Sequence, residues 1–299
     1  MDAIDEFHYR LSVAAGGFRP GAHPGTSLGA GQEFAAHARL FDHPDPRRID
    51  LRASLRDARG EWLVRTYRQR ASVPVHAVVD VSASMAFGAG RAKLDVVADF
   101  VESLGRSAFR AGDPAGLMAF NPDSANPGDA LYLPARHSRG VGSAMADALR
   151  QHASARPDLG TGAGQQIQGD GAALQTTLER LAGKAGLVFL VSDFHWSLAP
   201  LAGALDLLAH ASVVPLVVWD PAEIEPPADD VLLALRDAES GARRTLWVGS
   251  KLRAQWRATV AQRRSEIDAL FAKAGMRPFY LLGGFDPEAL SRHFLEGET

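Results

Sequence analysis

Short apolar runs alternate with amphipathic stretches from residue 73 to the end of the chain. Four of the runs have the length of buried strands, at 75–81, 115–120, 187–191 and 213–219. Between the first two, residues 91–110 carry apolar side chains at helical spacing. Strands that alternate with helices are typical of α/β proteins, so this part of the chain predicts a doubly wound, mostly parallel sheet.

The same patterns predict the remaining elements of the region 73–299. Further helices are expected at 141–153, 172–181, 198–210, 251–274 and 287–294, and further strands at 130–133 and 278–282. Residues 231–248 predict a small β-hairpin inserted into the α/β domain. We therefore expect one domain over residues 73–299.

Residues 1–72 lack the alternation of apolar runs and amphipathic stretches that marks residues 73–299. We expect them to form an N-terminal extension that packs on the core. Residues 16–31 hold so many Gly and Pro that a loop is predicted there. Residues 47–70 hold eight arginines against three acidic residues, in a chain whose overall net charge is −3. Such a segment is either a solvated face with ion pairs to Asp50, Asp57 and Glu61 or a surface that docks a partner through residues such as Arg47 and Arg48.

Composition narrows the classes of function. The chain has 299 residues, 46% of them hydrophobic, which is enough for a full-sized core. It has no Cys, which excludes disulfides and thiolate chemistry, and its near-neutral charge makes nucleic acid an improbable ligand. No apolar stretch reaches the roughly 20 residues that span a bilayer, and the acidic N-terminus lacks the features of a signal peptide. These features predict a cytoplasmic location without a membrane span.

Polar side chains gather where two predicted strands end. Asp80, Ser82 and Ser84 occupy alternate positions after the first core strand, and Asp193 follows the strand at 187–191. The carboxyl ends of parallel strands form the crevice in which α/β proteins bind ligands. Oxygen ligands with one or two carboxylates suit Mg²⁺, or Mn²⁺ as a substitute. We therefore predict a metal site at Asp80, Ser82, Ser84 and Asp193.

This arrangement of Asp80-x-Ser82-x-Ser84 with Ser192-Asp193 resembles the metal-ion-dependent adhesion site of von Willebrand factor A-like domains. Flanking segments sharpen the likeness, above all Asp45-Pro46-Arg47-Arg48-Ile49-Asp50 before the motif and Gly112-Asp113 after it. With them the chain is similar to an uncharacterised bacterial subfamily, a domain of unknown function encoded beside MoxR-type AAA+ ATPases. The resemblance implies a von Willebrand factor A-like fold, a Mg²⁺-type site and a non-enzymatic role as adaptor or assembly factor. The partners would be the ATPase and an unknown client protein.

The chain departs from the pattern of such sites at one ligand position. A Thr is expected before the strand that leads to Asp193, and the segment Gly169-Asp170-Gly171-Ala172 places Ala172 or Gly171 there. Asp170 or Thr161 would have to supply the missing oxygen. A site that binds partners without metal is therefore an open alternative.

Two other interpretations use the same residues. Asp80, Ser82 and Ser84 can form a capping turn in which their oxygens only satisfy backbone donors. Asp80 can also be the nucleophile of a metal-assisted phosphohydrolase. Position 82 is Ser rather than a second acid, and the nearest lysine in the sequence is Lys93, which argues against the hydrolase. His195 beside Asp193 is interpreted as a residue at the rim of the crevice rather than a catalytic base.

Overall fold

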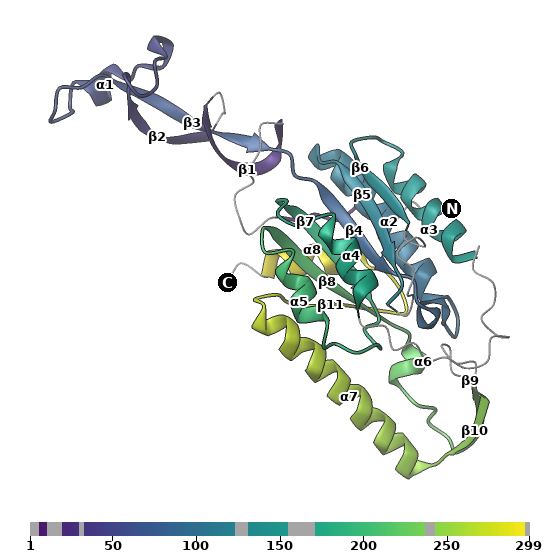
Figure 1. Ribbon diagram of the computed structural model, residues 1–299. Helices are drawn as coiled ribbons and strands as arrows, with labels where there is room; N and C mark the ends of the chain where they lie inside the picture. The colour runs from purple at the N-terminus through teal and green to yellow at the C-terminus, as the bar shows by residue number, and fades with distance from the viewer. Residues whose placement is uncertain are drawn as a thin grey trace.

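The computed structural model describes residues 6–10, 20–29, 33–122, 131–154, 171–236 and 243–296. Its body is built on a six-stranded sheet with the strand order β11-β8-β7-β4-β5-β6 (Figure 1). The strands are β4 (Val75–Asp80), β5 (Ala115–Phe120), β6 (Tyr132–Arg136), β7 (Gly186–Ser192), β8 (Ala211–Trp219) and β11 (Phe279–Leu282). All neighbouring strands are parallel except β5 and β6. The predicted α/β fold with a mostly parallel sheet is confirmed.

Helices cover both faces of this sheet and bury two apolar layers. One layer packs under α2 (Lys93–Ala111), α3 (Val141–Ser154) and α8 (Pro287–Glu296), and the other under α4 (Ala172–Glu179), α5 (Leu201–Asp206) and α7 (Ser250–Lys273). Side chains alternate between the two layers, so β4 sends Val79 to the first and Val78 to the second. Helix α5 is shorter than the predicted 198–210. Within the described residues, no helix is both long and apolar enough to cross a membrane.

A β-hairpin follows the end of β8. It consists of β9 (Val231–Arg236) and β10 (Arg243–Val248), which pair antiparallel with each other and with no other strand of the described residues. The hairpin lies beyond the N-terminal end of α7 (Figure 1). It corresponds to the segment where the sequence predicts an inserted hairpin.

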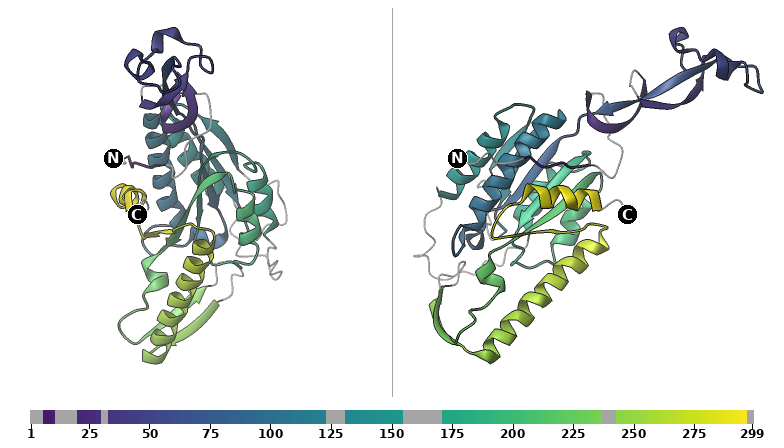
Figure 2. Two further views of the ribbon diagram at one scale, coloured as in Figure 1. Left: turned by 90° about the vertical axis from the view of Figure 1, so that its left-hand side faces the viewer. Right: turned by 180° about the vertical axis from the view of Figure 1, so that it is seen from behind.

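A second, three-stranded sheet projects from the body as an arm (Figures 1 and 2). Its strands are β1 (Pro20–Gly29), β2 (Glu33–Arg39) and β3 (Leu63–Ala71), in the order β1-β3-β2. The connection from β2 to β3 holds the 3-10 helix η1 (Pro46–Arg48) and helix α1 (Leu51–Ser54), which form the far end of the arm. Strand β3 leads directly into the body at β4.

The loop predicted over residues 16–31 is wrong for Pro20–Gly29, which form β1. The reason is the irregular pairing of β1 with β3, whose register shifts between Pro20 and His23 and again between Pro24 and Leu28. Interrupted ladders accommodate proline, which has no N–H to donate, and glycine. A strand of this kind has no periodic apolar signal.

Asp113, at the end of α2, ties the body to the segments that surround it. Its carboxylate is fully buried and accepts hydrogen bonds from the Tyr9 hydroxyl (2.6 Å), the His23 ring (2.6 Å) and the backbone N–H of Val73 (2.8 Å). His23 belongs to β1, and Val73 lies between β3 and β4. Close by, Phe7 is part of the apolar core under α2. One carboxylate thus fixes the root of the arm.

Candidate functional site

The crevice of the central sheet brings the two predicted carboxylates to one edge. Strands β4 and β7 are neighbours, with Val79 opposite Val191, so Asp80 and Ser192 end side by side. The Ser192 hydroxyl donates a 2.6 Å hydrogen bond to Asp80 Oδ2, and Asp193 follows directly. Adjacent parallel strands that end together produce this juxtaposition, as the sequence predicted.

Asp80 is enclosed by protein donors. It is 0% exposed; its Oδ1 accepts from the backbone N–H of Ser82 at 2.8 Å, and its Oδ2 also accepts from Trp196 Nε1 at 3.0 Å. Burial, followed by the charge of Asp193, raises the pKa of Asp80 to about 7, although hydrogen bonds from Ser192 and Ser82 oppose the shift. The carboxyl group therefore titrates near neutral pH and has both oxygens engaged.

Ser82 and Ser84 flank the start of the 3-10 helix η2 (Ala83–Ala86). Their hydroxyl oxygens lie 3.1 Å apart and share a hydrogen bond. Asp80, Ser82 and Ser84 therefore form one compact turn at the end of β4. Within this turn Asp80 accepts from the backbone N–H of Ser82, whereas the Ser82 side chain makes no capping hydrogen bond to η2.

Asp193 forms an ion pair that the sequence did not predict. Lys93, the first residue of α2, is only 2% exposed, and its Nζ lies 2.7 Å from Asp193 Oδ2. The other oxygen, Oδ1, accepts from the backbone N–H of His195 at 3.1 Å. The position of Lys93 in the sequence was therefore a wrong argument against a lysine in this crevice, because the start of α2 places its Nζ at Asp193.

Glu223 completes the cluster around Lys93. It lies on the short helix α6 (Pro221–Ile224), accepts from Lys93 Nζ at 2.7 Å through Oε1, and accepts from the backbone N–H of Asp220 at 3.0 Å through Oε2. Burial alone would raise the pKa of Glu223, but hydrogen bonds from His195 and Lys93 outweigh it and lower the pKa. The sequence analysis missed Glu223, although the capping-box pattern of Asp220 and Glu223 directly after a buried strand is a signal that could have found it.

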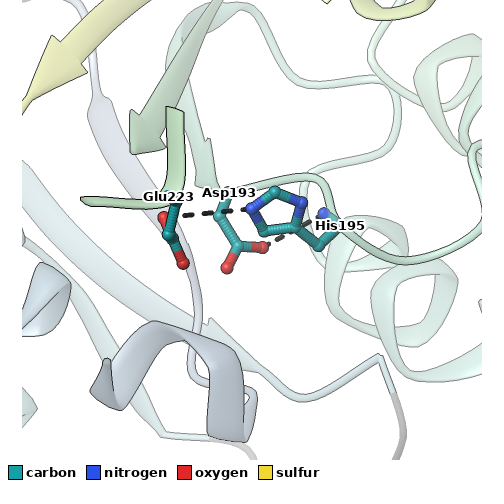
Figure 3. Close-up of side chains that lie close together, drawn as sticks. All are labelled: Asp193, His195 and Glu223. Carbon is teal, nitrogen blue, oxygen red and sulfur yellow. Dashed lines mark hydrogen bonds and ion pairs between the residues drawn. The ribbon is translucent and has the colours of Figure 1, made fainter. Parts of the chain in front are cut away.

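Asp193, His195 and Glu223 form a group that can bind a metal (Figure 3). One ligand atom from each lies within 4.8 Å of the others, and His195 Nε2 is 3.9 Å from Glu223 Oε2. The imidazole ring stacks on Trp219 with an interplanar angle of 9° and a centroid distance of 6.1 Å. This candidate metal-binding group shares Asp193 with the predicted set and adds His195 and Glu223.

The divalent-cation site expected at the four predicted ligands stays a prediction. Their oxygens are of the type that Mg²⁺ prefers. However, both oxygens of Asp80 and both oxygens of Asp193 already accept hydrogen bonds from protein donors, one of them the ammonium of Lys93. Ala172, at the position of the expected Thr, begins α4 and brings no side-chain oxygen. The proposed auxiliary ligands Asp170 and Thr161 lie outside the described residues.

Comparison with known proteins identifies the family. Residues 39–266 match the model of a family described as "Protein of unknown function DUF58", which is more than half of the chain. The chain belongs to the DUF58 family. A search of curated proteins found no match to it.

Solved structures similar to this DUF58 protein share little sequence with it. They include BatB, a conserved hypothetical protein from Bacteroides thetaiotaomicron, with 16% identity, a TM-score of 0.43, and coverage of 76% of this chain and 98% of that one. An aerotolerance-related membrane protein from Bacteroides fragilis NCTC 9343 has 16% identity, a TM-score of 0.39 and the same coverage. A von Willebrand factor type A structure from Catenulispora acidiphila has 14% identity and a TM-score of 0.33, over 77% of this chain and 43% of that one.

The expected fold holds, whereas the expected location changes. The six-stranded, mostly parallel sheet flanked by helices is consistent with the predicted von Willebrand factor A-like fold. The cytoplasmic location expected from the N-terminus is contradicted by the Bacteroides fragilis neighbour, which is described as a membrane protein. The cytoplasmic assignment is therefore withdrawn.

The far end of the arm, residues 40–62, carries part of the predicted Arg-rich surface of this DUF58 protein; we call it the distal tip. Asp50 anchors it: Oδ1 caps α1 through the backbone N–H groups of Arg52 and Ala53, and Oδ2 accepts from Arg65 Nε at 2.8 Å. Arg48 pairs with Asp45 at 3.2 Å and lies over the Tyr67 ring. Four exposed arginines form no side-chain ion pair within the described part of the chain, namely Arg47, Arg52, Arg56 and Arg59.

Proposed function

We propose that this protein is a non-enzymatic protein-binding adaptor that works with a MoxR-type AAA+ ATPase in the maturation of a client protein. The observation that carries the proposal is the distal tip, which combines exposed apolar side chains with arginines that form no ion pair within the described residues. The distal tip lies at the end of the projecting arm (Figure 2). Isolated exposed apolar residues are ordinary, but several at one end of a projection mark an interaction site.

Four large apolar residues of the distal tip face solvent. Phe41 is 94% exposed, Leu55 83%, Leu51 62% and Trp62 54%. Leu51 and Leu55 are four residues apart on one helical turn, so their side chains are neighbours. Because Asp50 fixes α1 on β3, this surface is ordered before a partner arrives, which lowers the entropic cost of binding.

The charges of the distal tip favour a protein partner over a lipid surface. Asp42, Asp45, Asp57 and Glu61 lie among its arginines, so acidic and basic side chains are interspersed. Membrane-binding segments instead use clusters of four to eight basic residues with few acidic ones. An apolar pocket rimmed by carboxylates on another protein complements the distal tip best.

The environment of Asp80 supports a non-enzymatic role. A carboxylate nucleophile must reach its substrate, whereas Asp80 is 0% exposed and bound by Ser192, Trp196 and Ser82. The phosphohydrolase alternative would need the crevice to open and Asp80 to lose these donors. Binding at the distal tip needs no such change.

The test is a binding measurement with the purified MoxR-type ATPase of the same organism. Arg47→Glu with Arg52→Glu removes two unpaired charges, and we expect binding to weaken at least about tenfold at low salt with less effect at high salt. Arg139→Glu with Arg292→Glu, two exposed arginines of the body, is the matched control. Binding that is unchanged in the tip variant, or absent in the wild type, would contradict the proposal.

The same measurement tests the predicted ion. Suppose that Mg²⁺ or Mn²⁺ at Asp80, Ser82, Ser84 and Asp193 bridges to the partner. A chelator must then weaken the complex of the wild type, and it must have no effect on the complex of Asp80→Ala. Because Lys93 already neutralises Asp193, we expect binding to persist in the presence of the chelator.

A further inference from the structure

The ammonium of Lys93 supplies a positive charge between two carboxylates of the crevice. It is one of the largest fully buried side chains of the body, and it makes ion pairs of 2.7 Å with both Asp193 and Glu223. A buried ammonium is tolerated only when it is paired and hydrogen-bonded in this way. The two carboxylates hold it between β7 and α6.

Helix stability does not account for the position of Lys93. It is the first residue of α2, where the helix dipole disfavours a cation. A lysine at this point would ordinarily extend into solvent, where its charge is solvated at no cost. Its burial therefore depends on the carboxylates of the crevice.

Lys93 and a divalent cation require the same oxygens. Asp193 and Glu223, with His195, are the group whose ligand atoms lie within 4.8 Å of one another (Figure 3). Lys93 Nζ contacts one oxygen of each carboxylate, so an ion bound between them would sit against a buried positive charge. The ammonium and the metal exclude each other.

We propose that Lys93 closes a divalent-cation position formed by Asp193, His195 and Glu223, so that removal of its charge opens a metal site. Two carboxylates and one imidazole suit Mn²⁺ and Zn²⁺ better than Mg²⁺, because Mg²⁺ prefers oxygen ligands alone. The position differs from the predicted set in using His195 and Glu223 in place of Asp80, Ser82 and Ser84. It does not depend on the adaptor role.

The test measures Mn²⁺ binding to the purified full-length chain by calorimetry and by the paramagnetic resonance of bound Mn²⁺. Lys93→Met removes the charge and keeps the length of the side chain. We expect its Kd for Mn²⁺ to be at least about tenfold lower than that of the wild type. Lys251→Met, an exposed lysine in the first turn of α7, is the matched control and leaves the affinity unchanged.

Two further variants keep the test decisive. Lys93→Gln is neutral and retains an N–H donor for Asp193, so it serves if Lys93→Met does not fold. His195→Ala in the background of either variant removes one ligand and leaves Asp193 and Glu223 unmutated. We expect it to return the affinity for Mn²⁺ to the wild-type value.

Three outcomes would overturn the proposal. The first is equal affinity of wild type and both neutral variants, and the second is an absence of binding in all of them, since Lys93 would then not be what keeps the ion out. The third is tight binding that survives His195→Ala, which would place the ion elsewhere. Tighter binding that depends on His195 supports it.

Discussion

Replacing Asp113 with alanine is the most informative perturbation of the arm. Its carboxylate is 0% exposed and holds three donors: the Tyr9 hydroxyl, the His23 ring and the backbone N–H of Val73. Hydrogen bonds to charged groups contribute about 1.5–3 kcal/mol each. Because the donors stay buried after the substitution, they lose their partner without gaining water.

The expected cost of Asp113→Ala is about 3–5 kcal/mol of unfolding free energy, the range for removing one partner from a buried ionic network. For a domain of this size that corresponds to a fall in Tm of about 6–10 °C. Differential scanning calorimetry measures it directly. Tyr9→Phe removes one of the three bonds, so its cost is about 1–2 kcal/mol.

The control is Asp206→Ala, an exposed aspartate at the end of α5 with no ion pair in the described residues. We expect its Tm to match the wild type within about 1 °C. If Asp113→Ala also melted within about 2 °C of the wild type, the network at the root of the arm would contribute little, and the reasoning would be refuted.

Two further predictions concern the body. The pKa of Asp80, raised to about 7, lies above its unfolded value of roughly 3.9. Between these two pH values the folded state retains a proton that the unfolded state loses. The free energy of unfolding therefore falls as pH rises from the lower value to the higher one. From pH 5 to 8, the wild type should lose roughly 2–3 kcal/mol more than Asp80→Asn in urea unfolding, and parallel curves would contradict the assignment. Gly105→Ala places a Cβ 2.2 Å from the Gly142 Cα where α2 crosses α3, which should cost about 1–3 kcal/mol. Gly203→Ala on α5, where a Cβ meets nothing within 4 Å, should leave stability equal or higher, and equal effects of the two substitutions would refute the packing argument.

The centre of the body is predictable from sequence because strands β4, β5 and β7 are buried on both faces. The apolar run at 187–191, and the run at 75–79 that only His76 interrupts, mark β7 and β4. The same reasoning fails for β1, whose Pro and Gly residues fit only because its ladder with β3 is interrupted. An arm that buries little apolar surface leaves no periodic pattern to detect.

Part of the site follows from topology and part does not. Asp80 and Asp193 meet because neighbouring parallel strands end together, which the order of the elements implies. The ion pair between Lys93 and Asp193 depends on how α2 packs over the loop after β4, and residues 100 positions apart give no local signal of it. Glu223 enters through the turn after β8, where its capping role is visible in the sequence but its reach to Lys93 is not.

The most direct test of the adaptor account is site-specific photo-cross-linking to the purified MoxR-type ATPase. A photoreactive phenylalanine analogue replaces Phe41 in the distal tip, and in a second protein it replaces Tyr132, an exposed aromatic residue on β6 of the body. The account predicts cross-links to the ATPase from position 41 and none from position 132. Cross-links only from position 132, or equal yields from both, would contradict the claim that the distal tip is the docking surface.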